Sequence, residues 1–330
     1  MQRRVWITWE TQRRNRTLSA ALKAKLFEFN IEYSLLFRYP LALLKTLSVF
    51  ISEKPEIIFV QNPSIVLSFF AVTYGLLFRI PVIVDSHNAG IYPFNGKKRW
   101  ANIVTQYLFR RAAFTVVSND YLAEYIRIKG GRSVAVPDPI PDIKPPTTKK
   151  IMNGTFNVLF ICSWADDEPY VEVIQAANLL DKNIFIYITG NTKGKELQYG
   201  SSLPENVVLT GYLKEEDYIK ALYSCDAVLD LTTRDNCLVC GAYESVAAEK
   251  PLIVSNSRVL MEYFPKGVLY TDNTGSDIAE QISRAALNKE ELQPKIKELK
   301  KDIIYAWNKR LFEVERMLGE CEKIVSGTRH

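Results

Sequence analysis

Short apolar runs alternate with helical stretches along both halves of this 330-residue chain. Pro81-Val82-Ile83-Val84 and Leu252-Ile253-Val254 are two such runs, and neither contains a charged residue. Strands buried on both faces have this composition, and they occur in parallel sheets that helices cover. The alternation therefore predicts an α/β fold with doubly wound parallel sheets, in a chain long enough for two domains.

A proline-rich segment marks the domain boundary. Residues 137–146 hold five of the 15 prolines, which predicts a stiff, extended linker. We expect a first domain at residues 1–140, a linker at 141–150, a second domain at 151–290 and a helical segment at 291–330. Two α/β domains joined in this way would leave a cleft between them, where a ligand can bind.

Charge is distributed unevenly along the chain. Residues 1–150 carry 22 lysines and arginines against ten acids, whereas residues 151–330 carry 20 against 27. The basic half is expected to face an anionic partner, which can be nucleic acid, anionic lipid or a phosphate-bearing substrate. A nucleic-acid-binding protein is one alternative, but the sequence contains no recognisable nucleic-acid module, and no nucleic-acid partner is expected.

The composition also bears on location. No charged residue occurs between Ile57 and Phe78, but Asn62-Pro63 interrupts this run and leaves about 15 helical residues, fewer than the ~20 that a membrane span needs. The N-terminus enters a strand at once, so we expect no signal peptide. The five cysteines are expected to be reduced in a cytosolic protein.

The first half begins with a predicted strand at Val5 to Trp9. A loop at residues 10–16 and a helix at 17–27 are expected next, followed by a strand, a helix and a strand at residues 31–37, 41–52 and 56–61. The loop after the first strand of a doubly wound sheet lies at the edge where ligands bind. Arg13, Arg14 and Arg16 in this loop would suit a phosphate of the acceptor, or they form a solvated basic loop.

The internal histidine follows a buried strand, in the sequence Asp85-Ser86-His87-Asn88. A histidine in this position, beside a carboxylate, can act in acid–base chemistry or donate a hydrogen bond to a transferring group. It can also satisfy loop carbonyls without any catalytic role. His87 and Asp85 are therefore candidate catalytic residues.

The most informative stretch is Asn236 to Ser255, which predicts a loop, a helix from Cys240 and a short strand. Gly241 and Ala242 at the helix start would let an anion approach the unbonded backbone N–H groups, and a phosphate is the usual anion there. Glu244 could accept bonds from hydroxyls beside that phosphate. Alternatives are an ordinary helix–strand unit, or a redox or zinc role for the Cys237-x-x-Cys240 pair, although zinc would need two more ligands.

This stretch resembles the donor-site signature of GT-B glycosyltransferases such as those of family four. In that signature two glutamates bracket a loop of small residues, and a small-residue helix leads into Lys-Pro and a strand. The positions in register are Glu244, Ala247, Ala248, Lys250, Pro251 and Ser255. Asn236 stands where the family has its first glutamate, which contacts the donor sugar, so the sugar and the stereochemical outcome stay open.

Further segments resemble the chitobiosyl-diphosphodolichol beta-mannosyltransferase family. These are Val60-Gln61-Asn62-Pro63-Ser64, Asp85-Ser86-His87-Asn88, Ser163-Trp164 with the acids after it, and Ile188-Thr189-Gly190. A bacterial relative that acts on undecaprenyl-diphosphate sugars is an alternative within the same superfamily.

The resemblance implies a GT-B fold, in which two Rossmann-like domains face each other across a cleft, and a nucleotide-diphosphate sugar as donor. It implies that the terminal helix returns to the first domain, with Tyr305, Trp307 and Phe312 as its anchors. The donor-binding candidates are Glu244, Arg234, Cys240, Gly241, Ala242, Gly190, Tyr212 and Ser163. The acceptor-binding candidates are Arg13, Arg14, Arg16 and Asn62, and the catalytic candidates are His87, Asp85 and Asn236. No metal and no cofactor are expected.

We therefore predict a metal-independent hexosyltransferase that acts at the cytosolic membrane face on a lipid-linked or polysaccharide acceptor, in exopolysaccharide, capsule or glycolipid assembly. An inactive nucleotide-sugar-binding subunit of a glycosyltransferase complex is the alternative. Cations and aromatics would form a patch resting on an anionic membrane, or the same residues would be half core and half solvated face. Its residues are Lys97, Lys98, Arg99, Trp100, Tyr107, Phe109, Arg110, Arg111, Phe69, Phe70, Phe78 and Arg79.

Overall fold

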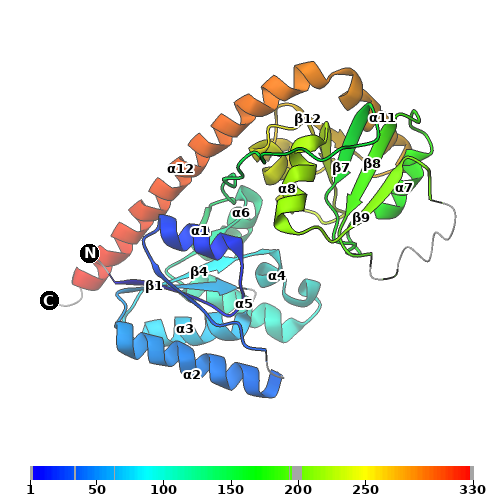
Figure 1. Cartoon of the computed structure of the whole chain (residues 1–330). Coiled ribbons are helices and arrows are strands. Elements are labelled where there is room, and N and C mark those ends of the chain that lie inside the picture. Colours follow the sequence, from blue (N-terminus) through cyan, green and yellow to red (C-terminus); the bar gives the residue numbers. More distant parts are fainter. Residues whose placement is uncertain (1–2, 33–34, 63, 193, 195–202, 328–330) are drawn as a thin grey trace. The chain divides into compact units, whose positions relative to one another are not determined.

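The computed structural model describes residues 3–32, 35–62, 64–192, 194 and 203–327, and Pro63 of the predicted turn lies outside them. The chain divides into two compact units, Met1–Asp138 with Ala306–His330, and Pro139–Tyr305. Each unit contains one six-stranded sheet in its described part, with helices packed on both faces (Figure 1). All strand pairs within these two sheets are parallel, which confirms the predicted α/β fold class.

The sheet of unit 1 has the strand order β2-β1-β3-β4-β5-β6. The strands are β1 (Arg4–Thr8), β2 (Lys25–Glu28), β3 (Ile57–Asn62), β4 (Val82–Ser86), β5 (Phe114–Val117) and β6 (Ser133–Ala135). The helices before the C-terminal segment are α1 (Arg13–Ala21), α2 (Leu35–Glu53), α3 (Ile65–Phe78), α4 (Asn88–Ile91), α5 (Arg99–Arg111) and α6 (Asp120–Ile128), with a 3-10 turn η1 (Pro93–Gly96). Helices α2, α3 and α5 cover one face of this sheet and α1 lies on the other (Figure 1).

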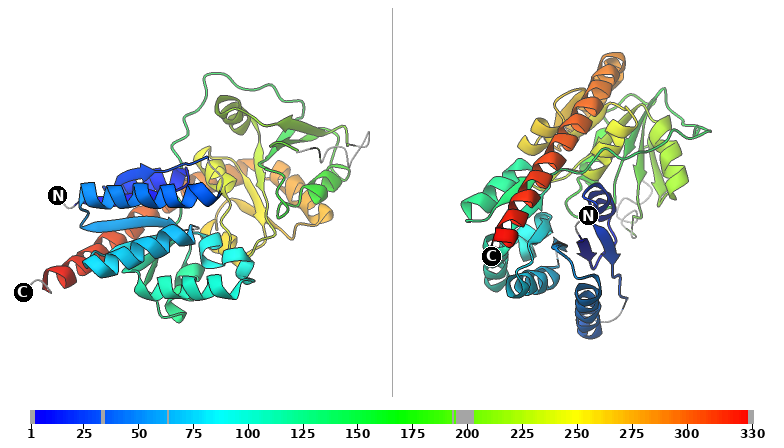
Figure 2. Two further views of the ribbon diagram at one scale, coloured as in Figure 1. Left: turned by 90° about the horizontal axis from the view of Figure 1, so that it is seen from below. Right: turned by 90° about the vertical axis from the view of Figure 1, so that its left-hand side faces the viewer.

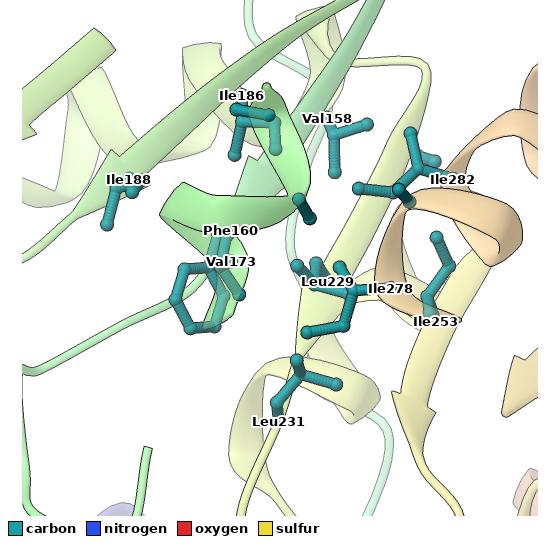
Figure 3. Close-up of a cluster of buried hydrophobic side chains, with 14 of the residues drawn as sticks. Val158, Phe160, Val173, Ile186, Ile188, Leu229, Leu231, Ile253, Ile278 and Ile282 are labelled. Carbon is teal, nitrogen blue, oxygen red and sulfur yellow. The ribbon is translucent and has the colours of Figure 1, made fainter. Parts of the chain in front are cut away.

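The sheet of unit 2 has the order β12-β11-β10-β7-β8-β9. Its strands are β7 (Phe156–Phe160), β8 (Ile184–Thr189), β9 (Val207–Gly211), β10 (Ala227–Asp230), β11 (Leu252–Ser255) and β12 (Val268–Thr271). Its helices are α7 (Tyr170–Ala177), α8 (Glu215–Ser224), α9 (Cys240–Ala247), α10 (Arg258–Tyr263) and α11 (Gly275–Leu287). Figure 3 shows the core on one face, where side chains of β7, β8, β10 and β11 meet those of α7 and α11.

Helix α12 (Lys289–Gly327) is uninterrupted and runs from orange to red in Figure 2. Its C-terminal part belongs to unit 1, where Val314 and Leu318 are fully buried against the sheet face that also carries α1. Trp307 donates its indole N–H to the carbonyl of Pro137 at 3.1 Å. Tyr305 and Phe312 are each 74% exposed, so these two predicted anchors are wrong, and aliphatic side chains on the buried stripe do the packing instead.

The structure corrects the start of the chain. Arg13–Ala21 is helical, so the three candidate arginines lie on α1 rather than on a loop. The helix ends earlier than predicted because Lys23 takes a left-handed φ of 52° and Ala24 N–H bonds back to the carbonyl of Ser19 at 2.8 Å. The next four residues pair in parallel with β1 as strand β2, in the segment predicted to be helical.

A second correction concerns residues 31–37, predicted as a strand. Helix α2 starts at Leu35 and contains Pro40, and Ile31 and Glu32, the described residues of the predicted strand before it, are not in a strand. The hydrophobic run at 57–78 divides into β3 and the 14-residue α3, as predicted. Within the described part of the chain, no helix combines the length and the apolarity needed to cross a membrane.

Candidate functional site

The order of strands in unit 2 is enough to locate a candidate ligand-binding site. From β7 the chain proceeds to β8 and β9 on one side, whereas β10, β11 and β12 lie on the other side. Ligands of open α/β sheets bind at the carboxyl ends of the two strands where the direction reverses. In unit 2 these are the ends of β7 and β10, from which residues 161–169 and 231–239 continue as loops. Helix α9 begins immediately after the second loop.

The loop after β7 closes around the carboxylate of Glu168. Ser163 donates its backbone N–H to Glu168 Oε2 at 2.9 Å and its hydroxyl to Oε1 at 3.0 Å. Ala165 adds a second backbone N–H at 2.8 Å. Trp164 between them has a left-handed φ of 63° and donates its indole N–H to the Thr189 carbonyl at 3.0 Å. This concave set of N–H groups suits an anion, and here it holds a carboxylate of the same chain.

Helix α9 begins beside a second carboxylate. Ala242 donates its backbone N–H to Asp230 Oδ2 at 3.0 Å, and a Cβ on Gly241 would lie 2.7 Å from the same oxygen. Gly241 is therefore required for this close approach. Burial raises the pKa of Asp230 well above its usual range, although the bond from Ala242 opposes that shift. The helix start that was predicted to hold a diphosphate thus already contacts Asp230.

Glu244 lies one turn into α9 and is held by Tyr218 of α8. The Tyr218 hydroxyl donates to Glu244 Oε2. Burial and the neighbouring Glu244 carboxylate raise the pKa of Tyr218, so the phenol keeps its proton. Glu244 is only partly buried, which makes it a carboxylate at the ligand-binding edge with a defined orientation.

Arg234 and Asn236 lie on the loop after β10. Arg234 pairs with Asp167 Oδ1 at 3.0 Å while its side chain stays 65% exposed. Asp167 is fixed by the Thr232 hydroxyl at 3.0 Å, so the two loops of the site are joined to each other. Asn236 has a left-handed φ of 57°, a conformation that asparagine tolerates better than glutamate. This backbone conformation gives a physical reason for asparagine at this position.

The remaining donor candidates are spread around the same edge. Gly190 follows β8 with φ of 90°, and a Cβ there would lie 2.2 Å from the carbonyl oxygen of Cys162. Tyr212 follows β9 and is 80% exposed. Cys240 is exposed at the first position of α9, and Cys237 is partly buried. Among the described residues no group of three histidine, cysteine or acidic side chains is arranged to hold a metal ion.

In unit 1, Asp85, His87 and Arg14 come together at the carboxyl end of β4. The guanidinium of Arg14 contacts Asp85 Oδ1 at 2.9 Å and Asp138 Oδ1 at 2.7 Å. Burial lowers the pKa of Arg14, but the two carboxylates outweigh that effect and raise it. His87 Nε2 lies 3.8 Å from Asp85 Oδ2. Burial lowers the pKa of His87 against the attraction of Asp85.

Of the other acceptor candidates, Asn62 lies beside His87, whereas Arg16 pairs with another part of the unit. Asn62 is buried and donates to Ser86 Oγ at 3.3 Å and to the Gly90 carbonyl at 3.2 Å. Its own carbonyl accepts the His87 backbone N–H at 3.1 Å. Arg16 contacts Glu28 of β2, and Arg13 is exposed. Of the three arginines, Arg14 has described contacts with the candidate catalytic pair.

Sequence reasoning missed Tyr218, and it gave Asp230 no function. Tyr218 follows an acidic run and is 26 residues from Glu244, so no local pattern links them. Asp230 was recognisable only as the last residue of a strand. Its place at a strand end, just before the key loop, was the available signal.

Residues 3–137 match the family model of a glycosyl transferase 4-like domain. Among curated protein sequences, none matches this chain. Anabaena HepE in complex with UDP has a similar structure, with a TM-score of 0.72 at 13% identity, over 96% of this chain and 100% of HepE. Sucrose-phosphate synthase from Thermosynechococcus elongatus gives a TM-score of 0.74 at 13% identity, over 97% of this chain and 99% of the synthase.

A putative UDP-N-acetylglucosamine 2-epimerase from Listeria monocytogenes is also similar, with a TM-score of 0.65 at 13% identity, over 97% of this chain and 98% of the other. At such identities the likeness concerns the fold. The matches together support a glycosyltransferase. The chain has a two-unit GT-B fold whose residues 3–137 match a glycosyl transferase 4-like domain.

Proposed function

We propose that this protein transfers a sugar from a nucleoside-diphosphate donor, bound by unit 2, to a lipid-linked or polysaccharide acceptor, bound by unit 1. The observation that carries the proposal is the position of Glu244, a held carboxylate at the edge where the order of strands reverses. Structures of the same fold have been determined with UDP, as in HepE. A carboxylate at that edge is suited to the hydroxyls of a ribose.

The catalytic part of the proposal rests on His87 in unit 1. Its lowered pKa favours the neutral imidazole at pH 7, which can accept a proton or orient a hydroxyl group of the acceptor. The Nε2 atom is buried on the side of Asp85 and has no hydrogen-bond partner in the described part of the chain. Asp85 and Arg14 would then set the orientation of the imidazole ring. In unit 2, the polar groups and cations of the donor site would stabilise the departing diphosphate.

Peripheral membrane contact is part of the proposal, because helices α3 and α5 present an apolar and cationic surface. Phe69 of α3 lies beside Tyr107 of α5, with ring centroids 5.6 Å apart. Trp100 and Ile103 of α5 are 58% and 61% exposed. Between residues 57 and 119 the single acid is Asp85, which is buried, so every exposed charge in this stretch is positive.

Some residues expected in this patch belong elsewhere. Phe109 is 4% exposed and packs in a core cluster with α6, and Phe70 stacks with Phe50 of α2. The surface itself is formed by Phe69, Phe94, Trp100 and Ile103, with cations at residues 97–99, 110 and 111. Each cation near an anionic surface contributes about 1 kcal/mol of attraction, and the aromatic side chains suit the interface.

Vesicle sedimentation tests the membrane part. We expect the protein to sediment with vesicles containing phosphatidylglycerol but not with pure phosphatidylcholine, and high salt should weaken the binding. The double substitution Trp100→Ala with Ile103→Ala should release the protein. Leu287→Ala, at an 84% exposed position of unit 2, is the matched control. Equal sedimentation of all variants would contradict this surface.

The alternative is an inactive nucleotide-sugar-binding subunit, and two observations favour it. Asn236 replaces the glutamate expected at the donor sugar. The N–H groups of Ser163 and Ala242, which would hold phosphate oxygens, contact Glu168 and Asp230 instead. This alternative predicts donor binding without formation of product.

The experiment that tests the proposal measures both binding and product. Thermal stability is measured with UDP, GDP, ADP, TDP and CMP, because a ligand of the native state at 100 times its Kd adds about 2.7 kcal/mol. We expect a shift with one diphosphate, absent in Glu244→Ala and retained in Glu262→Ala, an exposed glutamate on α10. Transfer from the matching nucleotide sugar then separates the enzyme from the inactive subunit. No shift with any nucleotide would overturn both.

A further inference from the structure

The phenol of Tyr218 donates a hydrogen bond to Glu244 from a different helix. Tyr218 lies in the first turn of α8, which precedes β10, whereas Glu244 lies on α9, which follows it. The ring of Tyr218 packs against the hydrophobic cluster that contains Leu222 and Val246. The hydroxyl is therefore anchored by the core, and it donates to Glu244 Oε2.

The hydrogen bond from Tyr218 to Glu244 also affects the electrostatics of the site. Asp230 lies close enough that the charge of Glu244 contributes to raising its pKa, after burial and alongside Glu168. Two or more carboxyl groups at one edge repel each other when they are ionised. A surface glutamate also has several accessible rotamers. The Tyr218 hydroxyl compensates part of the repulsion and selects one rotamer of Glu244.

We propose that Tyr218 is the positioning residue that orients Glu244 toward the ribose of the donor, and that this pair makes the site selective for ribonucleotides over 2′-deoxyribonucleotides. The inference rests on the proposed function, since it assumes that Glu244 binds the donor. It adds a residue and a selectivity that the proposed function does not contain.

The selectivity follows from the hydrogen-bonding chemistry of the pair. An ionised carboxylate only accepts hydrogen bonds, and its two oxygens offer about four acceptor sites. Tyr218 bonds to Oε2, and a carboxylate with several acceptor sites can accept bonds from ligand hydroxyls in addition. A site built to bond a substrate hydroxyl discriminates strongly against the analogue that lacks it, because its polar group then loses a partner.

The test compares ribo and deoxy ligands by isothermal titration calorimetry on the full chain. UDP is paired with 2′-deoxy-UDP, and GDP with 2′-deoxy-GDP. For the base that binds, we expect the ribonucleotide to bind about tenfold to a hundredfold more tightly. Tyr218→Phe should weaken the ribonucleotide by about threefold to tenfold and weaken the deoxynucleotide less, because the deoxynucleotide offers Glu244 only its 3′-hydroxyl.

Tyr223→Phe is the matched control. It lies on the same helix and donates its hydroxyl to the Ile143 carbonyl at 2.7 Å, so the substitution removes a similar bond remote from Glu244. It should leave the ribo-to-deoxy ratio unchanged. The double substitution of Tyr218→Phe with Glu244→Ala should match Glu244→Ala alone, because a positioning residue acts only through its partner.

The outcomes separate the two ideas. If Glu244→Ala abolishes the ribo preference but Tyr218→Phe does not change it, or weakens both ligands equally, the positioning role is wrong and the proposed function stands. If the wild type binds UDP or GDP without any ribo preference, this inference is wrong. If it binds no nucleotide, the proposed function and this inference fall together. Thermal melting of each variant confirms that it is folded.

Discussion

Arg14 and Asp85 form an ion pair whose side chains are only 4% and 1% exposed. The guanidinium Nε also contacts both oxygens of Asp85 at 3.1 Å. This buried pair joins helix α1 to the carboxyl end of β4. His87 follows β4 directly and precedes helix α4. The carboxylate next to the candidate catalytic histidine is therefore held mainly by an arginine.

Removing one partner of this pair should destabilise the protein strongly. Arg14→Met would leave Asp85 buried without its cation, and we expect a loss of about 3–5 kcal/mol in the free energy of unfolding. Urea denaturation measures the loss. Arg16→Met, two residues along the same helix in an exposed pair with Glu28, should leave the unfolding midpoint nearly unchanged. Equal effects of the two substitutions would contradict the structural role of Arg14.

The pair also shows where sequence reasoning stops. The buried strands at 57–62, 82–86 and 252–255 were predictable because parallel strands covered on both faces require uninterrupted apolar runs. Strand β2 was not predictable, since Lys25–Glu28 is half-buried and becomes a strand by pairing with β1. Arg14 and Asp85 are 71 residues apart, and no periodicity in the sequence relates residues at that distance.

Protonation of His87 should reduce stability. Because the fold lowers the pKa of His87 from its ordinary value of 6.5, the neutral ring is favoured in the native state. Its contribution is complete above pH 6.5 and is lost as the pH falls toward the lowered value. We expect the free energy of unfolding of the wild type to decline below pH 6.5 more steeply than that of His87→Gln. Parallel curves from pH 7.5 to 5.5 would show that the environment of His87 is not as described.

Asp230 should show the opposite dependence on pH. Its pKa is raised, so the native state favours the protonated form, and stability is lost as the pH rises above about 3.8, by up to ~1.4 kcal/mol per pH unit. Asp230→Asn retains an acceptor for Ala242 and should gain stability over the wild type as the pH rises. Urea denaturation between pH 4 and 7 tests this.

Asp277 provides a control of opposite sign. Burial raises its pKa, but bonds from Gln281 and from the Asp272 backbone outweigh that effect and lower it. Asp277→Asn should therefore lose stability relative to the wild type as the pH rises through the range in which the carboxylate ionises. If both substitutions changed stability in the same direction with pH, the assignment for Asp230 would be wrong.

Gly190 should be the least replaceable glycine at the donor edge. Alanine there must take a left-handed φ and also place its Cβ 2.2 Å from the Cys162 carbonyl oxygen. Gly211 also has a positive φ, 67°, with nothing within 4 Å of its Cβ position. Gly211→Ala should cost about 1–2 kcal/mol from backbone strain alone. Gly190→Ala should cost a further ~1–3 kcal/mol, and equal losses in denaturation would contradict the close packing.

For the site, residue types were predictable but their partners were not. Glu244 could be singled out because it lies one turn into a helix that begins with small residues. Two backbone bonds depend on loop conformations, including the left-handed φ of Trp164. They run from Ser163 to Glu168 and from Ala242 to Asp230. Such backbone angles depend on tertiary contacts, for example the indole bond to Thr189, and leave no pattern in the sequence.

Helix α12 has a consequence for the order in which the protein folds during synthesis. Unit 2 is one continuous segment, whereas unit 1 needs Ala306–His330 as well as the first 138 residues. Val314, Met317 and Leu318 fill the core of unit 1 beside Trp6 and Phe59. On the ribosome, the first unit to emerge therefore keeps one face of its sheet incompletely covered until the second has been made. The unit that is synthesised first is completed last, and exposed apolar surface in that interval is a point of contact for chaperones.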